Sequence, residues 1–282
     1  MSNHFFEYKK KQGSYPEVCG GNTPLSLNMT KIITAGCCII GDEILSGKTR
    51  DQNSHYLATT LFNVGIELKT IQVVGDNVQD ITKSVRELSS QYDLVFTSGG
   101  IGPTHDDITY ESIASAFNLE MKVDTGTYNF LEKQIANKGQ TMTKHHVRMV
   151  TFPYPAELIR EMVLPVVVVN KNVYILPGIP SLFKMLLDSI QPRLEKLSGS
   201  KFYRNEIATA ASEVTMADIL TAAQLKGNEY GIRVGSYPLW GKNPENIRVV
   251  VNVSGKDQSK VDELSKEITN DIKGWPYKQS RL

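Results

Sequence analysis

From Lys31 onward, short apolar runs alternate with amphipathic stretches along the chain. Apolar runs of about four to eight residues are typical of buried strands, and an apolar residue at every third or fourth position is typical of a helix that buries one face. Strands that alternate with helices form a parallel sheet with helices on both faces. The pattern therefore predicts an α/β fold, a three-layer sandwich around a mostly parallel sheet.

Most of this pattern lies before residue 198. We expect strands at residues 32–40, 67–74 and 94–97, and helices at residues 53–64, 78–88, 109–117, 127–138 and 180–197. Two apolar runs at residues 166–169 and 173–176 flank a polar Asn-Lys-Asn segment, which predicts a β-hairpin.

A second, smaller domain is expected after Ser198, Gly199 and Ser200, which have the composition of a linker. Beyond them, we expect strands at residues 206–209, 232–236 and 247–253, and helices at residues 217–225 and 258–272. This order favours a small α+β domain. The expected boundaries are residues 29–197 for the first domain, 201–275 for the second and 276–282 for a tail.

Residues 1–28 form an expected disordered leader, because they show no apolar periodicity. The leader has neither the apolar centre of a secretory signal nor an arginine, so a cytoplasmic location is expected, with a mitochondrial one as the alternative. No run approaches the roughly 18 apolar residues that a membrane span needs. We therefore expect no membrane partner.

Composition narrows the class of protein. The 282 residues include 31 Lys and Arg against 30 Asp and Glu, and this balance argues against a broad basic surface for nucleic acid. The three cysteines, Cys19, Cys37 and Cys38, cannot form an even disulfide framework, and Cys37 and Cys38 are adjacent in an apolar run, which indicates a reducing compartment.

Candidate chemistry lies where the strands end. Gly41, Asp42 and Glu43 follow the first strand, Gly75 and Asp76 follow the second, and the segment SGGIGPTHDDIT at residues 98–109 follows the third. Ligands of open α/β sheets bind beyond the carboxyl ends of the strands. We therefore expect these three loops to meet at one site.

The third loop is the most informative. Gly99, Gly100 and Gly102 free the backbone to turn consecutive N–H groups toward a phosphate, to which Ser98 and Thr104 can add hydroxyl donors. The helix expected at residue 109 would add its positive end. A tight turn that uses one aspartate as the helix N-cap would explain the glycines equally well, but not two adjacent aspartates.

Phosphate and carboxylates repel each other, so a phosphate loop near Asp42, Glu43, Asp76, Asp106 and Asp107 predicts an intervening cation such as magnesium. A single aspartate at a strand end is an ordinary turn residue, and it is the shared position of these residues that carries the prediction. Pro177 and Gly178 form a further turn after a strand, which either closes the wall of the site or only connects a strand to a helix.

These motifs resemble a known family. GDEILSG at residues 41–47 and SGGIGPTHDDIT look like the signatures of the molybdopterin-binding fold. The order of the motifs, including DQN at residues 51–53, VGD at residues 74–76 and LPGIP at residues 176–180, resembles its CinA-like branch. After residue 200, ADILTAAQ and IRVGSYPLWGKNPENIRVVV resemble the segment that follows this domain in animal FAD synthases. The reductase-like and deamidase domains of those relatives are missing, so neither FAD synthesis nor nicotinamide mononucleotide deamidation is expected. Residues 161–165 depart from the bacterial pattern, and substrate contacts there are expected to differ.

The resemblance implies a homodimeric, metal-dependent pyrophosphatase that hydrolyses FAD or ADP-ribose to AMP plus FMN or ribose 5-phosphate. Magnesium or cobalt is the expected cofactor, with potassium as a second cation. The expected metal ligands are Asp76, Asp107 and Asp42, and the expected catalytic residues are Asp107, Asp76, Asp106 and Glu43, with Asp106 or Glu43 as the general base. The expected phosphate and substrate contacts are Ser98, Gly99, Gly100, Gly102, Thr104, Gly41, Asp42, Pro177 and Gly178. A molybdopterin-binding protein or adenylyltransferase, and a non-catalytic flavin or nucleotide sensor, remain alternatives.

Overall fold

The computed structural model describes residues 32–241 and 246–277. The expected leader lies outside the described residues, and the expected tail is described only as far as Tyr277. Within the described ranges, no helix is both long and apolar enough to cross a bilayer.

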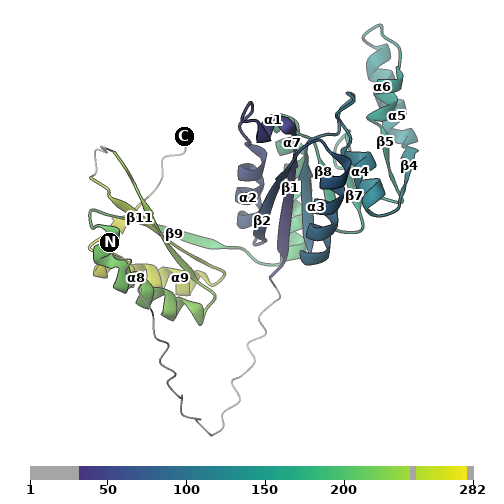
Figure 1. Cartoon of the computed structure of the whole chain (residues 1–282). Coiled ribbons are helices and arrows are strands. Elements are labelled where there is room, and N and C mark those ends of the chain that lie inside the picture. The colour runs from purple at the N-terminus through teal and green to yellow at the C-terminus, as the bar shows by residue number, and fades with distance from the viewer. Residues whose placement is uncertain (1–31, 242–245, 278–282) are drawn as a thin grey trace, which may run out of the picture. The chain divides into compact units, whose positions relative to one another are not determined.

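A six-stranded sheet forms the centre of the larger domain, in the order β2-β1-β3-β8-β7-β6 (Figure 1). Its strands are β1 (Thr34–Ile40), β2 (Glu67–Val74), β3 (Leu94–Ser98), β6 (Glu157–Ile159), β7 (Val166–Val169) and β8 (Val173–Leu176). β2, β1, β3 and β8 are parallel, whereas β7 is antiparallel to both β8 and β6. The expected mostly parallel sheet and the expected hairpin are both confirmed.

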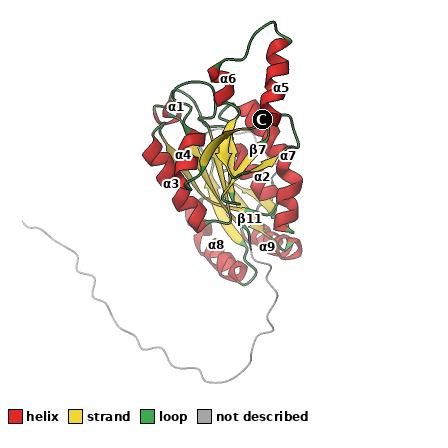
Figure 2. Cartoon of the chain, turned by 90° about the vertical axis from the view of Figure 1, so that its right-hand side faces the viewer, coloured by secondary structure: helices red, strands yellow, loops and turns green. Residues whose placement is uncertain are grey.

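Helices cover both faces of this sheet. α2 (Asn53–Asn63) and α7 (Pro180–Ser198) pack on one core, and α3 (Val78–Gln91) and α4 (Thr109–Ala116) pack on the other. Figure 2 shows the two pairs on opposite sides of the strands. The three expected layers are therefore present.

β1 shows why the apolar runs are nearly continuous. Cys37 joins the core under α2 and α7, while its neighbour Cys38 joins the core under α3 and α4, because successive side chains of a strand point to opposite faces. Both thiols are fully buried, and burial raises the pKa of the Cys38 thiol to about 11. A strand that is buried on both faces therefore shows no alternation of polar and apolar residues in its sequence.

Residues 120–154 form an extension that we call the arm (Figure 1). It contains β4 (Glu120–Val123), α5 (Thr125–Ala136), α6 (Lys144–Arg148) and β5 (Thr151–Tyr154), with β4 and β5 paired antiparallel. Only the α5 helix was expected from the sequence.

The smaller domain has an antiparallel sheet in the order β10-β11-β9-β12. Its elements are β9 (Tyr203–Thr209), α8 (Glu213–Asn228), β10 (Arg233–Pro238), β11 (Val249–Gly255), α9 (Gln258–Asp271) and β12 (Trp275–Pro276). Val251 and Val253 of β11 pack with Val261 and Ile268 of α9 in a core of their own. The expected α+β domain is confirmed.

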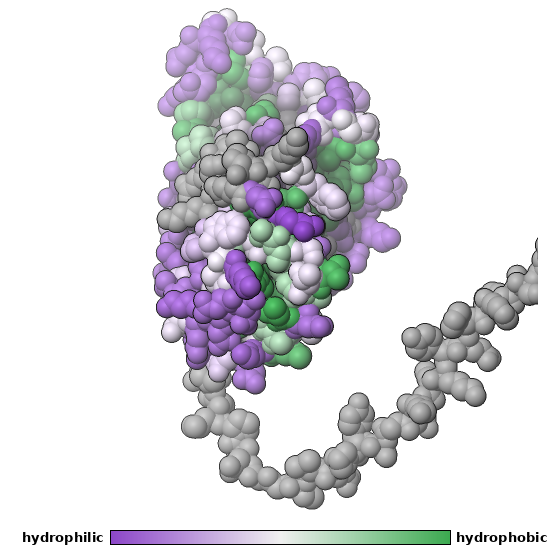
Figure 3. All heavy atoms as spheres, turned by 90° about the vertical axis from the view of Figure 1, so that its left-hand side faces the viewer, coloured by the Kyte–Doolittle hydropathy of each residue, from purple (hydrophilic) through white to green (hydrophobic). Residues whose placement is uncertain are grey.

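The surface carries no large apolar area on the face drawn in Figure 3, where hydrophilic residues predominate and apolar ones form separate small groups. Scattered apolar residues of this kind are normal on protein surfaces.

Candidate functional site

Four loops meet at one edge of the large sheet, because β2, β1, β3 and β8 are parallel neighbours whose carboxyl ends lie together. After β1 the chain forms the short helix α1 (Asp42–Leu45), and after β3 it forms the glycine loop, residues 99–108. The sequence-based expectation that the loops after these strands meet is therefore confirmed.

The glycine loop is shaped by its first two residues. Gly99 and Gly100 have φ values of 111° and 64°, a region that favours glycine. A Cβ atom on Gly99 would collide with the carbonyl oxygen of Ile40, and one on Gly100 would collide with the Thr109 hydroxyl. The backbone N–H groups of residues 100–102 have no acceptor within the described part of the chain. They are donors available to an anion.

Gly102 allows the carboxylate of Asp107 to approach the backbone closely, because glycine has no Cβ atom. A Cβ atom there would lie 2.6 Å from Oδ2 of Asp107. The same Oδ2 accepts hydrogen bonds from the Thr104 N–H at 2.8 Å and from the Thr104 hydroxyl. Ile108, not Asp107, occupies the N-cap position of α4, so the alternative in which an aspartate only caps this helix is wrong for Asp107.

Asp42 and Asp76 are brought together by reciprocal hydrogen bonds. The Asp42 N–H donates to Oδ2 of Asp76 at 3.0 Å, and the Asp76 N–H donates to Oδ1 of Asp42 at 3.3 Å. Burial raises the pKa of Asp76, and the neighbouring carboxylates of Asp42, Glu43 and Asp106 raise it further. Negative charge therefore accumulates at this end of the site.

The two candidate bases differ in position. Glu43 lines the cavity described below, whereas Asp106 is exposed and does not line it. Hydrogen bonding within the glycine loop lowers the pKa of Asp106, with smaller contributions from His105 and Arg148. Asp106 therefore stays ionised at neutral pH.

Ser98 lies beneath the glycine loop and is 2% exposed. Its hydroxyl donates to the Pro177 carbonyl at 3.3 Å and accepts from Nδ2 of Asn53 at 2.9 Å. The structure thus places Ser98 in an internal hydrogen-bond network and not in the cavity wall.

A cavity of about 500 Å³ opens beside the glycine loop. Seven of the expected site residues line it: Glu43, Gly99, Gly100, Gly102, Asp107, Pro177 and Gly178. Its remaining wall is mostly apolar and includes Ile101, Met149, Phe152, Leu164, Ile179 and Leu182. The cavity falls within the range of about 300–1,000 Å³ that is typical of small-molecule sites. Gly41, Asp42, Ser98, Thr104, Asp76 and Asp106 lie outside this lining.

Sequence reasoning did not anticipate that the arm lines the cavity. Met149 and Phe152 of the arm help to form the apolar wall. Arg148 at the end of α6 donates a hydrogen bond to the Asp107 carbonyl and forms an ion pair with Glu111 at 3.0 Å. The arm is thereby joined to the glycine loop.

The expected metal ligands are only partly gathered. Asp42 and Asp76 adjoin each other, while the Asp107 carboxylate is held by Thr104. Within residues 32–241 and 246–277, no three His, Cys, Asp or Glu side chains converge as ligands. The oxygen donors that are present suit a hard cation, whose remaining ligands would be water and phosphate. The metal itself stays a prediction.

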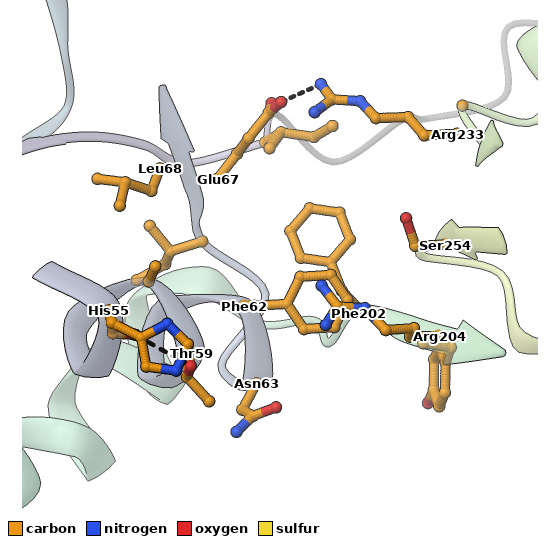
Figure 4. A pocket seen from close by; sticks show the side chains of 15 residues that line it. His55, Thr59, Phe62, Asn63, Glu67, Leu68, Phe202, Arg204, Arg233 and Ser254 are labelled. Atoms are coloured by element: carbon orange, nitrogen blue, oxygen red, sulfur yellow. Dashed lines mark hydrogen bonds and ion pairs between the residues drawn. The ribbon is translucent and has the colours of Figure 1, made fainter. Parts of the chain in front are cut away.

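A second cavity, of about 740 Å³, adjoins Glu67 at the start of β2 (Figure 4). The rings of Phe62 and Phe202 stack there with centroids 5.3 Å apart, and the Arg204 guanidinium lies 4.1 Å from the Phe62 centroid. Arg233 is paired with Glu67. This cavity contains no residue of the glycine loop, and both of its arginines already have partners, so it is a weaker candidate.

The fold and the site together define an α/β protein with a glycine-rich loop at the carboxyl ends of its parallel strands. Residues 36–196 match the family described as "Probable molybdopterin binding domain", and residues 201–278 match the family described as "FAD synthase, middle domain". The chain belongs to the family of proteins that carry this probable molybdopterin binding domain, followed here by the FAD synthase middle domain. The expected resemblance is confirmed.

Relatives support both assignments. The chain is 34% identical over 227 residues to a "Probable FAD synthase" of Caenorhabditis briggsae, an alignment that covers 73% of this chain and 43% of the relative. It is 35% identical over 160 residues to a "CinA-like protein" of Myxococcus xanthus, which covers 55% of this chain and 38% of the relative. The chain thus spans less than half the length of these relatives.

A solved structure supports the fold. The protein CinA from Thermoplasma acidophilum, whose function is described as unknown, superposes with a TM-score of 0.53 at 28% identity. The similarity covers 58% of this chain and 98% of that one.

Proposed function

We propose that the chain is a metal-dependent nucleotide pyrophosphatase that hydrolyses the diphosphate of FAD or ADP-ribose, giving AMP plus FMN or ribose 5-phosphate. One observation carries this proposal. The N–H groups at residues 100–102, which have no acceptor among the described residues, and the carboxylates of Glu43 and Asp107 lie around one cavity with an apolar wall. Hydrogen-bond donors can bind the diphosphate of a dinucleotide, carboxylates can bind its metal ion, and an apolar surface can pack against its base.

The glycine loop binds the diphosphate in this proposal. Consecutive N–H donors at residues 100–102 point to an anion, and the N-terminus of α4 adds the positive end of its dipole. No side chain at Gly99 or Gly100 blocks the approach of the phosphate to the backbone.

Asp42, Asp76 and Asp107 would hold a divalent cation, magnesium or cobalt, with potassium as a second cation. Such a cation supplies neutralisation of phosphoryl charge and acidification of a bound water. The accumulation of carboxylates around Asp76 supports this assignment, because four acidic groups without a cation repel one another.

Glu43 is the preferred general base, since it lines the cavity while Asp106 does not. It accepts a proton from the water that attacks phosphorus, and the bond from phosphorus to the bridging oxygen breaks. Asp106 is ionised at neutral pH and adds to the negative potential at the rim.

The apolar wall ranks the substrates. Met149, Phe152, Ile179 and Leu182 suit a planar ring, which buries apolar area against them. FAD carries a planar aromatic ring system at both ends, whereas ADP-ribose carries one only at its adenine end. We therefore expect a lower KM for FAD than for ADP-ribose. In this proposal the substrate is a small molecule. A homodimer remains the expected assembly.

The family description favours one further candidate, a protein that binds or adenylylates molybdopterin. It would use the same phosphate-binding loop. A ligand that is held without turnover would instead support a flavin or nucleotide sensor.

The test is direct. The full chain is incubated with FAD or ADP-ribose and magnesium or cobalt, with and without potassium, and the products are separated by chromatography. Asp76→Asn removes one proposed metal ligand, and Asp218→Asn removes an exposed carboxylate of α8 as the matched control. Wild type and Asp218→Asn should release AMP, and Asp76→Asn should not. No AMP from wild type with either substrate would overturn the proposal, and tighter binding of molybdopterin than of any dinucleotide would favour the other candidate.

A further inference from the structure

Asn53 is a buried polar residue, 6% exposed, at the first position of α2. Its backbone N–H donates to Oδ1 of Asp51 at 2.9 Å, and the N–H of Ser54 donates to the same oxygen at 3.1 Å. Two orphan donors of the helix terminus are thereby satisfied. The start of α2 is a fixed support for the Asn53 side chain.

The Asn53 amide joins the end of β3, directly before the glycine loop, to the turn at Pro177 and Gly178. Its Nδ2 donates to the Ser98 hydroxyl at 2.9 Å and to the Gly178 carbonyl at 2.8 Å. A carbonyl oxygen can only accept, so the NH₂ group must face Gly178, and the chemistry of the partners fixes the orientation of the amide. An aspartate of the same shape could make neither bond as a donor.

The two loops lie against each other at this point. The Gly99 N–H donates to the Leu176 carbonyl at 3.2 Å, and a Cβ atom on Gly178 would lie 3.2 Å from the Gly99 Cα. Gly99 and Gly178 both line the cavity, whereas Asn53 does not. Asn53 therefore acts on the spacing of the two loops from behind the cavity wall.

Packing alone does not account for an asparagine here. Its Oδ1 is buried and has no hydrogen-bond partner within the described part of the chain. A buried acceptor without a partner lowers stability, and an apolar side chain would avoid that cost. The two hydrogen bonds from Nδ2 to Ser98 and Gly178 therefore account for an asparagine at this position.

We propose that Asn53 is a positioning residue, which holds the glycine loop and the turn at Pro177 and Gly178 at the spacing that receives the diphosphate. It does not touch the substrate. The kinetic part of this inference rests on the proposed function, whereas the structural part, the coupling of the two loops, does not.

The test uses Asn53→Asp in the full chain, which keeps the shape and removes both donors. The matched control is Asn63→Asp, the same change at the exposed last residue of the same helix. Amide spectra of the glycine-labelled protein report on the loops directly. The signals of Gly99, Gly100 and Gly178 should move in Asn53→Asp and stay in place in Asn63→Asp.

Kinetics and binding supply the second readout. We expect kcat/KM for FAD to fall by about 100-fold in Asn53→Asp, mostly through kcat, because misplaced groups lose transition-state contacts first. The affinity for inorganic diphosphate should fall as well. Ser98→Ala should cause a smaller loss, and adding it to Asn53→Ala should cost less than the sum of the two, because both remove the same bond.

The outcomes separate the two ideas. If wild type releases no AMP, the proposed function fails, and Asn53 is judged from the glycine signals and from diphosphate binding. If wild type and Asn63→Asp are active and Asn53→Asp matches them in kcat/KM and in its glycine signals, the positioning role is refuted. If Asn53→Asp does not fold, the double variant of Ser98→Ala and Asn53→Ala decides. A loss in kcat/KM equal to the sum of the two single losses would refute the positioning role.

Discussion

Replacing Asp76 with asparagine should stabilise the metal-free protein at neutral pH while it abolishes hydrolysis. Asp76 is partly buried, and the neighbouring carboxylates of Asp42 and Glu43 help to raise its pKa. The substitution removes the charge but keeps an acceptor for the Asp42 N–H, which now donates to Oδ2 at 3.0 Å. Because the site is open to solvent, repulsion is screened, and we expect a gain of about 1 kcal/mol, or a rise in Tm of roughly 2–4 °C.

The pH dependence fixes the sign of this effect. Burial and neighbouring carboxylates raise the pKa of Asp76 in the folded protein above its value in the unfolded chain. A raised carboxyl pKa contributes stability below the unfolded pKa of about 3.9, and this contribution is lost as the pH rises through the folded pKa. The advantage of Asp76→Asn should therefore be present at pH 7 and shrink toward zero near pH 3.5.

Urea unfolding of wild type, Asp76→Asn and Asp218→Asn at both pH values, with a chelator present, measures the difference. Adding magnesium should then stabilise wild type and leave Asp76→Asn unchanged, since a ligand that binds only the folded state raises its stability. A variant that is less stable than wild type at pH 7 would refute the idea that burial of the Asp76 charge and repulsion from its neighbours destabilise the protein. A gain that does not depend on pH would refute the charge as its cause.

Two further substitutions test the loop and the arm. Gly99→Ala should lower the free energy of unfolding in urea by about 2–4 kcal/mol and abolish AMP release, because φ of Gly99 is positive and the new Cβ would collide with the backbone. Gly139→Ala is the control, since φ is also positive there but the Cβ would lie in open space. It should lower the free energy of unfolding by about 1 kcal/mol and keep activity. Burial alone would raise the pKa of Asp124, but hydrogen bonds from Arg160 and Thr127 outweigh it and lower the pKa. Asp124 therefore contributes stability above the unfolded pKa of about 3.9, which is lost as the pH falls. Asp124→Asn should thus cost about 1 kcal/mol at pH 7, with the difference from wild type narrowing near pH 3 in unfolding curves.

The larger sheet was predictable except for β6, because burial on both faces leaves nearly continuous apolar runs in β1, β3, β7 and β8. The missed elements lack that signal. β4 has one half-buried residue among four, and both β5 and β12 contain a proline, which is unusual inside a strand. These strands form because a neighbouring strand is there to pair with them, and a partner distant in the chain leaves no local pattern.

The site was predictable only in its loops. Gly99, Gly100 and Asp76 follow strands, and a strand end can be recognised in the sequence. Asn53 is the first residue of a helix, and only the DQN segment marked it, because its role depends on Ser98 and Gly178, which lie far along the chain. The apolar wall was missed for the same reason, since it joins the arm to residues near the start of α7.

The two halves of the site have opposite electrostatic needs. The N–H groups at residues 100–102 lack an acceptor among the described residues and favour an anion, while the carboxylates around Asp76 favour a cation. A free phosphate would satisfy the loop and repel the carboxylates, and a free metal ion would do the reverse. A diphosphate that carries a divalent cation satisfies both at once, and the apolar wall then has only the attached ring to cover it. This combination is why we favour a metal-bound dinucleotide over either component alone as the ligand of this protein.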